Sequence, residues 1–220
     1  MKYERTLKAK HRLADMIKEG KFFGRSIISR DTPIDGGVYL GGNPREALVV
    51  DSIKYPLLAE YYDDLKRECK RPLIKTFNRP RVIPITMEKV TSLLTFSVEE
   101  VNRIVKEYDV ADDYKISLTR FIKEGYGVCR HQALLAGFFM EKFAKEKLIR
   151  GKVSMDRNSS YSGAHCWVRY VNSRGEVGIL DPAQDFWGTL EESIEQSKWW
   201  YSREEDLLER RLKRLESNKK

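Results

Sequence analysis

The longest uninterrupted run of apolar or glycine residues in this chain of 220 residues is the stretch 133–140. A helix that crosses a bilayer needs about 20 such residues, so we expect no transmembrane helix. The run lies within residues 130–147, whose alanine, leucine, phenylalanine and methionine side chains predict a helix with a large buried face. Because 41% of the residues are hydrophobic, we expect a folded protein with a packed interior.

The sequence contains three cysteines, Cys69, Cys129 and Cys166. An odd number does not suit a disulfide framework, and no apolar secretion signal follows the basic amino terminus. We therefore expect free thiols and a cytoplasmic location. The 41 basic and 33 acidic residues give a net charge of +8, but they are intermixed along the chain, so nucleic-acid binding is not indicated.

Glycines, prolines and apolar spacing divide the chain into three parts. We expect residues 1–85 to form an N-terminal extension of helices and loops packed on a core, residues 86–188 to form that core, and residues 189–220 to form C-terminal helices. Three prolines within residues 71–84 predict an extended connection, which marks the first boundary.

Local patterns predict the elements of the first two parts. Apolar spacing predicts helices over residues 2–18 and 56–69, whereas glycines and prolines in residues 31–44 predict a loop with at most a short strand at 38–40. Beyond the boundary, the apolar residues of 86–108 predict one or two helices.

The C-terminal part carries two helix-start signals, because Thr189 and Ser202 each begin a capping-box pattern. In the second helix, Leu208, Leu212 and Leu215 form an apolar stripe on an otherwise charged surface. We expect this stripe to dock on its own domain. The alternative is a contact with a partner helix or with a second copy of the chain.

Cys129 follows the residues GYGV at 125–128 and precedes the helix expected over residues 130–147. The glycines permit a sharp turn, which places Cys129 at the helix N-terminus. There, unpaired amide groups and the helix dipole favour a thiolate, the form of cysteine that acts as a nucleophile. The alternative is an inert buried cysteine, which we expect for Cys69.

Alternating residues predict two strands, over 165–171 and 177–180, joined by a turn at 172–174. In an antiparallel hairpin of this loop length, His165 lies directly opposite Asp181, with Cβ atoms about 5 Å apart. Taken separately, each residue has a simpler interpretation: a histidine packed in the core, and an aspartate that ends a strand. Their expected pairing favours a carboxylate that orients an imidazole.

Three sequence blocks together resemble the transglutaminase-like cysteine enzyme superfamily: GVCRHQALL at 127–135, HCWV at 165–168 and ILDP at 179–182. The resemblance covers about residues 117–185. It implies an α+β fold with a papain-like core, in which the nucleophile helix packs on an antiparallel sheet.

The resemblance also implies a catalytic triad, with Cys129 as nucleophile, His165 as general base and acid, and Asp181 as orienting carboxylate. The implied function is cysteine-dependent acyl transfer or hydrolysis on a protein or peptide amide, as in peptidases, amidases, deamidases and transglutaminases. The alternative is a catalytically weak or inactive module that binds a protein partner in its cleft.

Many members of this superfamily supply a second oxyanion donor from a glutamine or tryptophan upstream of the nucleophile. No glutamine or tryptophan precedes Cys129 here, so a backbone amide or another side chain must serve. Tyr114 and Asn102 are the candidates for this donor. A missing donor costs about 3 kcal/mol of transition-state stabilisation.

Further side chains are expected near the nucleophile. Arg130 would favour the thiolate by its charge, and the simpler alternative is a solvated surface arginine. His131 would contact substrate or cap the helix, or else be a partly exposed helical residue. Trp167, expected opposite Ile179, is a candidate for binding substrate. Five aromatic residues after Asp181 are expected to pack in the core, and the alternatives are that they shelter the site or bind a peptide: Phe186, Trp187, Trp199, Trp200 and Tyr201.

A zinc site is the remaining alternative, with Cys129, His131, His165 and Cys166 as ligands. Adjacent residues of a strand point to opposite faces, so His165 and Cys166 are not expected to meet at one ion. The spacing of Cys129 and His131, with one residue between them, is also unusual for structural zinc. We expect no metal and no cofactor.

Overall fold

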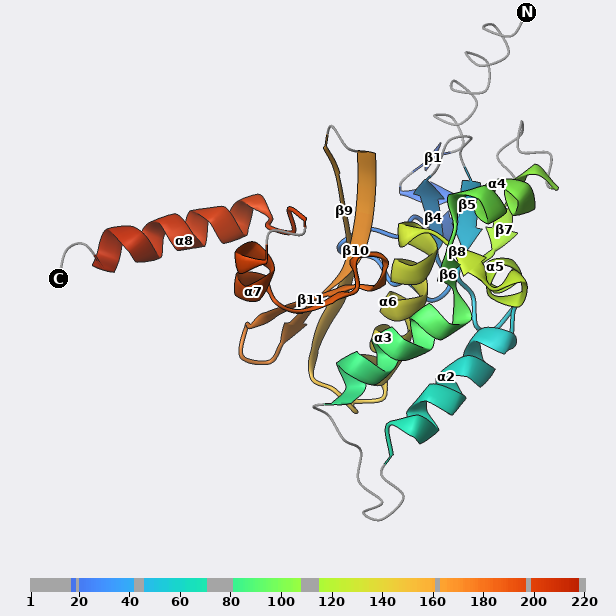
Figure 1. The fold of residues 1–220 in the computed structure, drawn as a ribbon, viewed down its shortest axis with the longest axis horizontal. Coiled ribbons are helices and arrows are strands. Elements are labelled where there is room, and N and C mark those ends of the chain that lie inside the picture. Colours follow the sequence, from blue (N-terminus) through green and yellow to red (C-terminus); the bar gives the residue numbers. More distant parts are fainter. Residues whose placement is uncertain are drawn as a thin grey trace, which may run out of the picture.

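The computed structural model describes residues 17–18, 20–41, 46–70, 81–107, 115–160, 163–196 and 199–217. The chain is a mixed α+β protein, as predicted, with a long central helix beside an antiparallel sheet (Figure 1).

The largest sheet has four antiparallel strands in the order β12-β11-β10-β9. Its strands are β9 (Gly151–Ser160), β10 (Gly163–Asn172), β11 (Val177–Asp181) and β12 (Phe186–Thr189). The central helix α6 (Cys129–Lys145) packs against β9 and β10. The two strands predicted from the sequence, β10 and β11, are confirmed. The largely polar sequence of β9 does not predict a strand.

The remaining strands of the described residues form smaller sheets. They are formed by β1 (Ile17–Lys18), β2 (Lys21–Phe22) and β3 (Arg25–Ser26); by β4 (Val38–Gly41), β5 (Glu46–Val49) and β7 (Lys115–Ser117); and by β6 (Thr95–Phe96) with β8 (Tyr126–Gly127). The short strand predicted at residues 38–40 is confirmed as β4. The predicted helix over residues 2–18 lies mostly outside the described residues, and its end is wrong, because 17–18 form a strand.

The helices before α6 are α2 (Leu57–Glu68), α3 (Val82–Leu93), α4 (Val98–Lys106) and α5 (Leu118–Glu124). The structure confirms the helix expected over residues 56–69. It also shows two helices where one or two were expected over 86–108, the first of which begins earlier, at Val82. The extended connection predicted to reach Pro84 is wrong at its end. Pro84 fits the first turn of α3, where backbone N–H groups lack intrahelical acceptors, so no hydrogen bond is lost.

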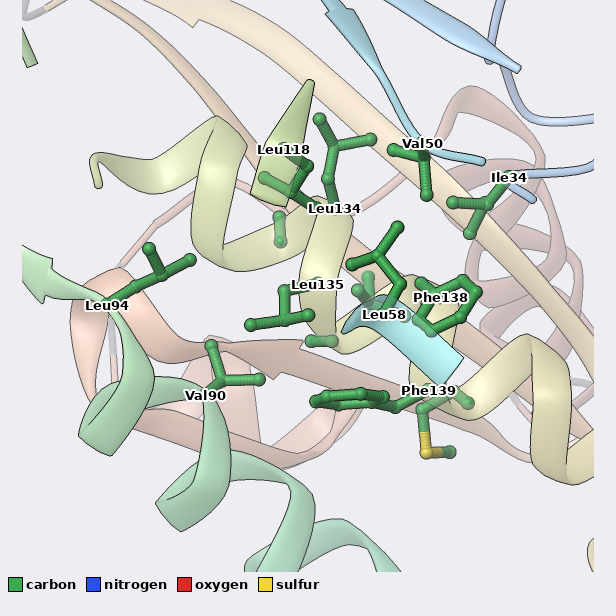
Figure 2. Packing of buried hydrophobic residues seen from close by; sticks show 14 of the residues in the cluster. Ile34, Val50, Leu58, Val90, Leu94, Leu118, Leu134, Leu135, Phe138 and Phe139 are labelled. Atoms are coloured by element: carbon green, nitrogen blue, oxygen red, sulfur yellow. The ribbon is translucent and has the colours of Figure 1, made fainter. Parts of the chain in front are cut away.

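One hydrophobic core joins the N-terminal part to α6 (Figure 2). Leu135 and Phe138 of α6 are fully buried in the same cluster as Ile34 and Val50 from the N-terminal part and Val90 from α3. The expected boundary between residues 85 and 86 falls inside α3. Residues on the two sides of that boundary therefore share one interior.

The C-terminal helices are α7 (Leu190–Glu195) and α8 (Glu204–Ser217). Thr189 caps α7 with the predicted capping box, and α8 extends away from the sheet (Figure 1). Leu208, Leu212 and Leu215 are exposed, at 61%, 60% and 53%. The expectation that this stripe docks on its own domain is therefore wrong for the described residues, and a partner contact stays a prediction.

Within the parts of the chain that the structure describes, every helix is too short or too polar to cross a bilayer.

Replacing Leu135 with alanine removes a fully buried side chain from the centre of the core. We expect the free energy of unfolding to fall by about 2–5 kcal/mol, measured by urea denaturation, because a cavity replaces the packed leucine. The matched control is Leu212→Ala on the exposed face of α8, which should change it by less than about 0.5 kcal/mol. Equal effects of the two substitutions would contradict this packing.

Candidate active site

Cys129 is the first residue of α6, which confirms its predicted position at a helix N-terminus. The turn before it is built by two glycines. Gly125 ends α5 with a left-handed backbone, at φ 81°. Gly127 lies so close to the helix that an added Cβ would come within 2.9 Å of the His131 Cβ atom. These glycines bring the chain sharply from α5 into α6.

His165 lies on β10 and contacts Asp181 at the end of β11. The predicted register is wrong by two residues, because Val171 pairs with Val177 through a longer turn. His165 is therefore not directly opposite Asp181. A shift of two residues keeps both side chains on the same face of the sheet. They meet diagonally, with His165 Nε2 and Asp181 Oδ2 2.5 Å apart.

The shifted register also changes the neighbouring pairs. Ile179 pairs with Arg169 rather than with Trp167. Ladder pairing between β10 and β11 stops at Val168 and Leu180, and Pro182 begins a short 3-10 helix, η3 (Pro182–Gln184). Residues 165 and 166 of β10 therefore lie beyond the end of β11, where the N-terminus of α6 approaches the strand.

The sulfur of Cys129 is surrounded by hydrogen-bond donors. Hydrogen bonds from the Cys166 thiol, from His165 and from the Cys166 backbone N–H lower the pKa of Cys129 to about 4, although burial opposes this shift. The sulfur is therefore a thiolate at neutral pH. It lies at the positive end of α6, which favours the same charge.

His165 is the cation that balances this thiolate. Burial disfavours its charge, but hydrogen bonds to Asp181 and Cys129 outweigh burial and raise the pKa of His165 to about 9. Because Nε2 contacts Asp181, Nδ1 is the ring nitrogen left for the sulfur. The arrangement is an imidazolium held between a thiolate and a carboxylate.

Cys166 contacts the same sulfur, although the alternation of β10 places it on the face opposite His165. Both residues reach Cys129 because the sulfur lies at the edge of the strand, past the end of β11. The bond to the Cys129 thiolate, together with burial, raises the pKa of Cys166 well above its usual range. Cys166 is thus a neutral thiol donor. Alternation along the strand could not predict this contact.

Asp181 is fully buried and is fixed by a second donor, the hydroxyl of Tyr201, at 2.8 Å from Oδ2. The aromatic cluster predicted after Asp181 therefore divides between two roles. Tyr201 and Phe186 are buried and stack, whereas the Trp199 ring lies 4.7 Å from the His165 ring and shelters it. Trp187 and Trp200 are exposed, so neither packs in the core.

A cleft of about 580 Å³ opens beside the nucleophile. It is lined by Tyr39, Gly41, Cys129, Arg130, Arg157, Asn158, Ser159, Ala164, His165 and Cys166. The cleft gives a ligand access to the thiolate and to the imidazolium together.

The structure places two further neighbours of the nucleophile. Arg130 lines the cleft, and its Nε atom pairs with the buried carboxylate of Glu46. His131 is fully buried, so it does not contact substrate. Its Nδ1 accepts a hydrogen bond from the Val128 N–H at 3.1 Å, which confirms the capping alternative. Burial also lowers the pKa of His131 well below its usual range, so the ring is neutral.

Three further predicted residues do not line the cleft. Trp167 is buried against Tyr201 and does not line the cleft, so its expected role in substrate binding is wrong. Asn102 lines a separate hollow along α4 and is not at the nucleophile, so it is not the second oxyanion donor. Tyr114 lies outside the described residues.

The contacts of four residues near the candidate site are not predicted by the sequence: Cys166, Tyr201, Glu46 and Arg157. Cys166 and Tyr201 lie in segments that the sequence analysis singled out, but only the strand register and the chain path after Asp181 show their contacts. Glu46 is 84 residues from Arg130, and no local pattern connects them.

Among the described residues, no group of three or more His, Cys, Asp or Glu side chains could hold a metal ion. Of the four residues weighed as zinc ligands, His131 faces Val128 and Glu46 instead. Comparison of the chain with protein-family models, with curated proteins and with solved structures gave no match.

The alkylation rate of Cys129 by iodoacetamide should be nearly constant between about pH 5 and pH 8. The thiolate forms as the pH rises through the Cys129 pKa of about 4, and the imidazolium is lost only near pH 9. A free cysteine peptide instead gains about tenfold per pH unit below its pKa of about 8.5. Mass spectrometry of each modified site measures both rates.

In the same experiment, His165→Ala should shift the rise in rate to higher pH. Cys69 is the internal control, because burial raises its pKa to about 11 and keeps it unreactive in the folded protein. A Cys129 rate that follows the free peptide, unaffected by His165→Ala, would contradict the ion pair.

Tyr201→Phe removes a donor from the buried Asp181 carboxylate while keeping the ring. We expect the free energy of unfolding to fall by about 1–3 kcal/mol in thermal denaturation. The matched control is Tyr170→Phe, which loses an exposed hydrogen bond to the Arg150 carbonyl and should cost less than about 1 kcal/mol. A smaller loss for Tyr201 than for Tyr170 would argue against the assigned contact.

Proposed function

We propose that the protein is a cysteine-dependent enzyme of acyl transfer or hydrolysis that acts on a protein or peptide amide. In this proposal Cys129 is the nucleophile, His165 the general acid and base, and Asp181 the orienting carboxylate. The observation that carries it is the thiolate of Cys129 held against the His165 imidazolium at the wall of an open cleft.

The chemistry follows from the charges. The thiolate attacks the carbonyl carbon of an amide, and the electron pair of the C=O bond moves to oxygen. His165 then donates its Nδ1 proton to the leaving nitrogen as the C–N bond breaks, which leaves a thioester on Cys129. Neutral His165 next takes a proton from water or from a second amine, and that molecule displaces the sulfur.

Asp181 and Tyr201 keep the imidazole aimed at the sulfur. The 2.5 Å contact between Asp181 and His165 Nε2 leaves Nδ1 for proton transfer. The Tyr201 hydroxyl holds the same carboxylate oxygen, so the carboxylate cannot swing away without losing both bonds. The Trp199 ring beside His165 limits access of water to the ion pair.

The same geometry supports the proposed membership of the transglutaminase-like superfamily. Its implied core places a nucleophile helix on an antiparallel sheet, and here α6 packs on β9 and β10 with the three expected residues meeting at its N-terminus. The rival is a module that has lost catalysis and binds a partner in the cleft. A binding module does not need a thiolate, so acylation of Cys129 separates the two.

The test uses p-nitrophenyl acetate, an activated ester that needs little transition-state assistance. We expect a burst of nitrophenol with acetyl transfer to Cys129, seen by mass spectrometry of the intact protein and its peptides. Cys129→Ser should abolish the burst, and His165→Ala should slow acylation by about 100-fold or more. Cys69→Ser is the control and should leave the burst unchanged. An absent burst, or one that persists in Cys129→Ser, would contradict the proposal.

A further inference from the structure

The register of β9 and β10 places Arg157 close to the nucleophile. It is the direct cross-strand partner of Cys166, and directly opposed residues of antiparallel strands project from the same face. The Cys166 thiol donates to the Cys129 sulfur. Arg157 therefore stands beside the residue that contacts the nucleophile, and both arginine and nucleophile line the same cleft.

The guanidinium of Arg157 is held in place without being neutralised. Its Nη1 donates to the Leu40 carbonyl at 3.1 Å, and the guanidinium also hydrogen-bonds to the side chain of Tyr39, whose ring centre lies 5.7 Å away. Among the described residues, no carboxylate lies within ion-pair distance of Arg157. Its remaining donors are therefore available to a ligand, in the fork geometry that suits a carboxylate.

The other charges of the cleft do not pair with Arg157. The Cys129 thiolate and the buried Asp181 carboxylate share the one positive charge of His165, and Arg130 is paired with Glu46. The described side chains that line the cleft include no Asp or Glu. Of the described cations that line the cleft, Arg157 alone therefore has no carboxylate partner.

We propose that Arg157 forms an anion subsite that selects acyl donors with a carboxylate close to the attacked carbonyl, as in an acidic peptide. This inference rests on the proposed function, because it names the substrate class of the same cleft. Arg157 would bind the carboxylate by two parallel N–H donors. Neutral or basic donors would leave its charge without a partner.

The test compares two alkylating reagents that differ only near the reacting carbon: iodoacetate, which carries a carboxylate, and iodoacetamide, which is neutral. The measured quantity is the ratio of their second-order rate constants at Cys129, followed by mass spectrometry at neutral pH. Arg157→Gln should lower this ratio by roughly threefold to tenfold, the range for one charge near a solvated surface. Arg157→Lys should recover part of it, because it restores the charge without the fork.

The matched control is Arg174→Gln, which removes an exposed arginine in the turn between β10 and β11 and should leave the ratio unchanged. A ratio that falls equally in both variants, or that does not change in Arg157→Gln, would overturn the subsite. Rates that match a free cysteine peptide for both reagents would contradict the proposed function instead. The ratio would still report on the subsite in that case, since it cancels the reactivity of the sulfur.

Discussion

The N-terminus of α6 meets β10 just past the end of β11, and the candidate site depends on this contact. Ladder pairing stops at Val168 and Leu180, so the strand edge at His165 and Cys166 is free to meet the helix. Cys129 accepts hydrogen bonds there from the Cys166 backbone and from both side chains. If β11 continued its pairing along β10, the sulfur would lose these donors. The end of one strand thus defines where the nucleophile lies.

A buried ion pair is costly unless its hydrogen-bonding groups are satisfied, and the surrounding segments supply most of the partners here, although Asp181 Oδ1 is buried without one among the described residues. The thiolate has three donors, and the imidazolium has the Asp181 carboxylate, which Tyr201 holds in turn. Tyr201 belongs to the segment that precedes α8. The C-terminal part of the chain therefore contacts the candidate site through Tyr201, even though α8 itself extends away from the sheet (Figure 1).

Much of this arrangement could be predicted from the sequence, because it depends on local rules. The glycines before Cys129 and the apolar run after it locate the helix and its first residue. Side chains alternate between the two faces of a strand, so a register shift of two residues leaves each side chain on the same face. His165 and Asp181 therefore share a face even though the turn is longer than expected. The contacts of Cys166 and Glu46 could not be predicted, because they depend on strand edges and on pairs distant in the sequence. The strand β9, which carries Arg157, could not be predicted either, because its sequence is largely polar.

The most direct test of the central claim is a nitrogen NMR titration of the histidine side chains, of which the chain has three. The account predicts that His165 titrates near pH 9 and that Cys129→Ser lowers this value toward the ordinary range, because the thiolate no longer stabilises the cation. The buried His131 should stay neutral and serve as an internal reference. An imidazole of His165 that titrates near pH 6.5, with no response to Cys129→Ser, would show that the ion pair does not exist.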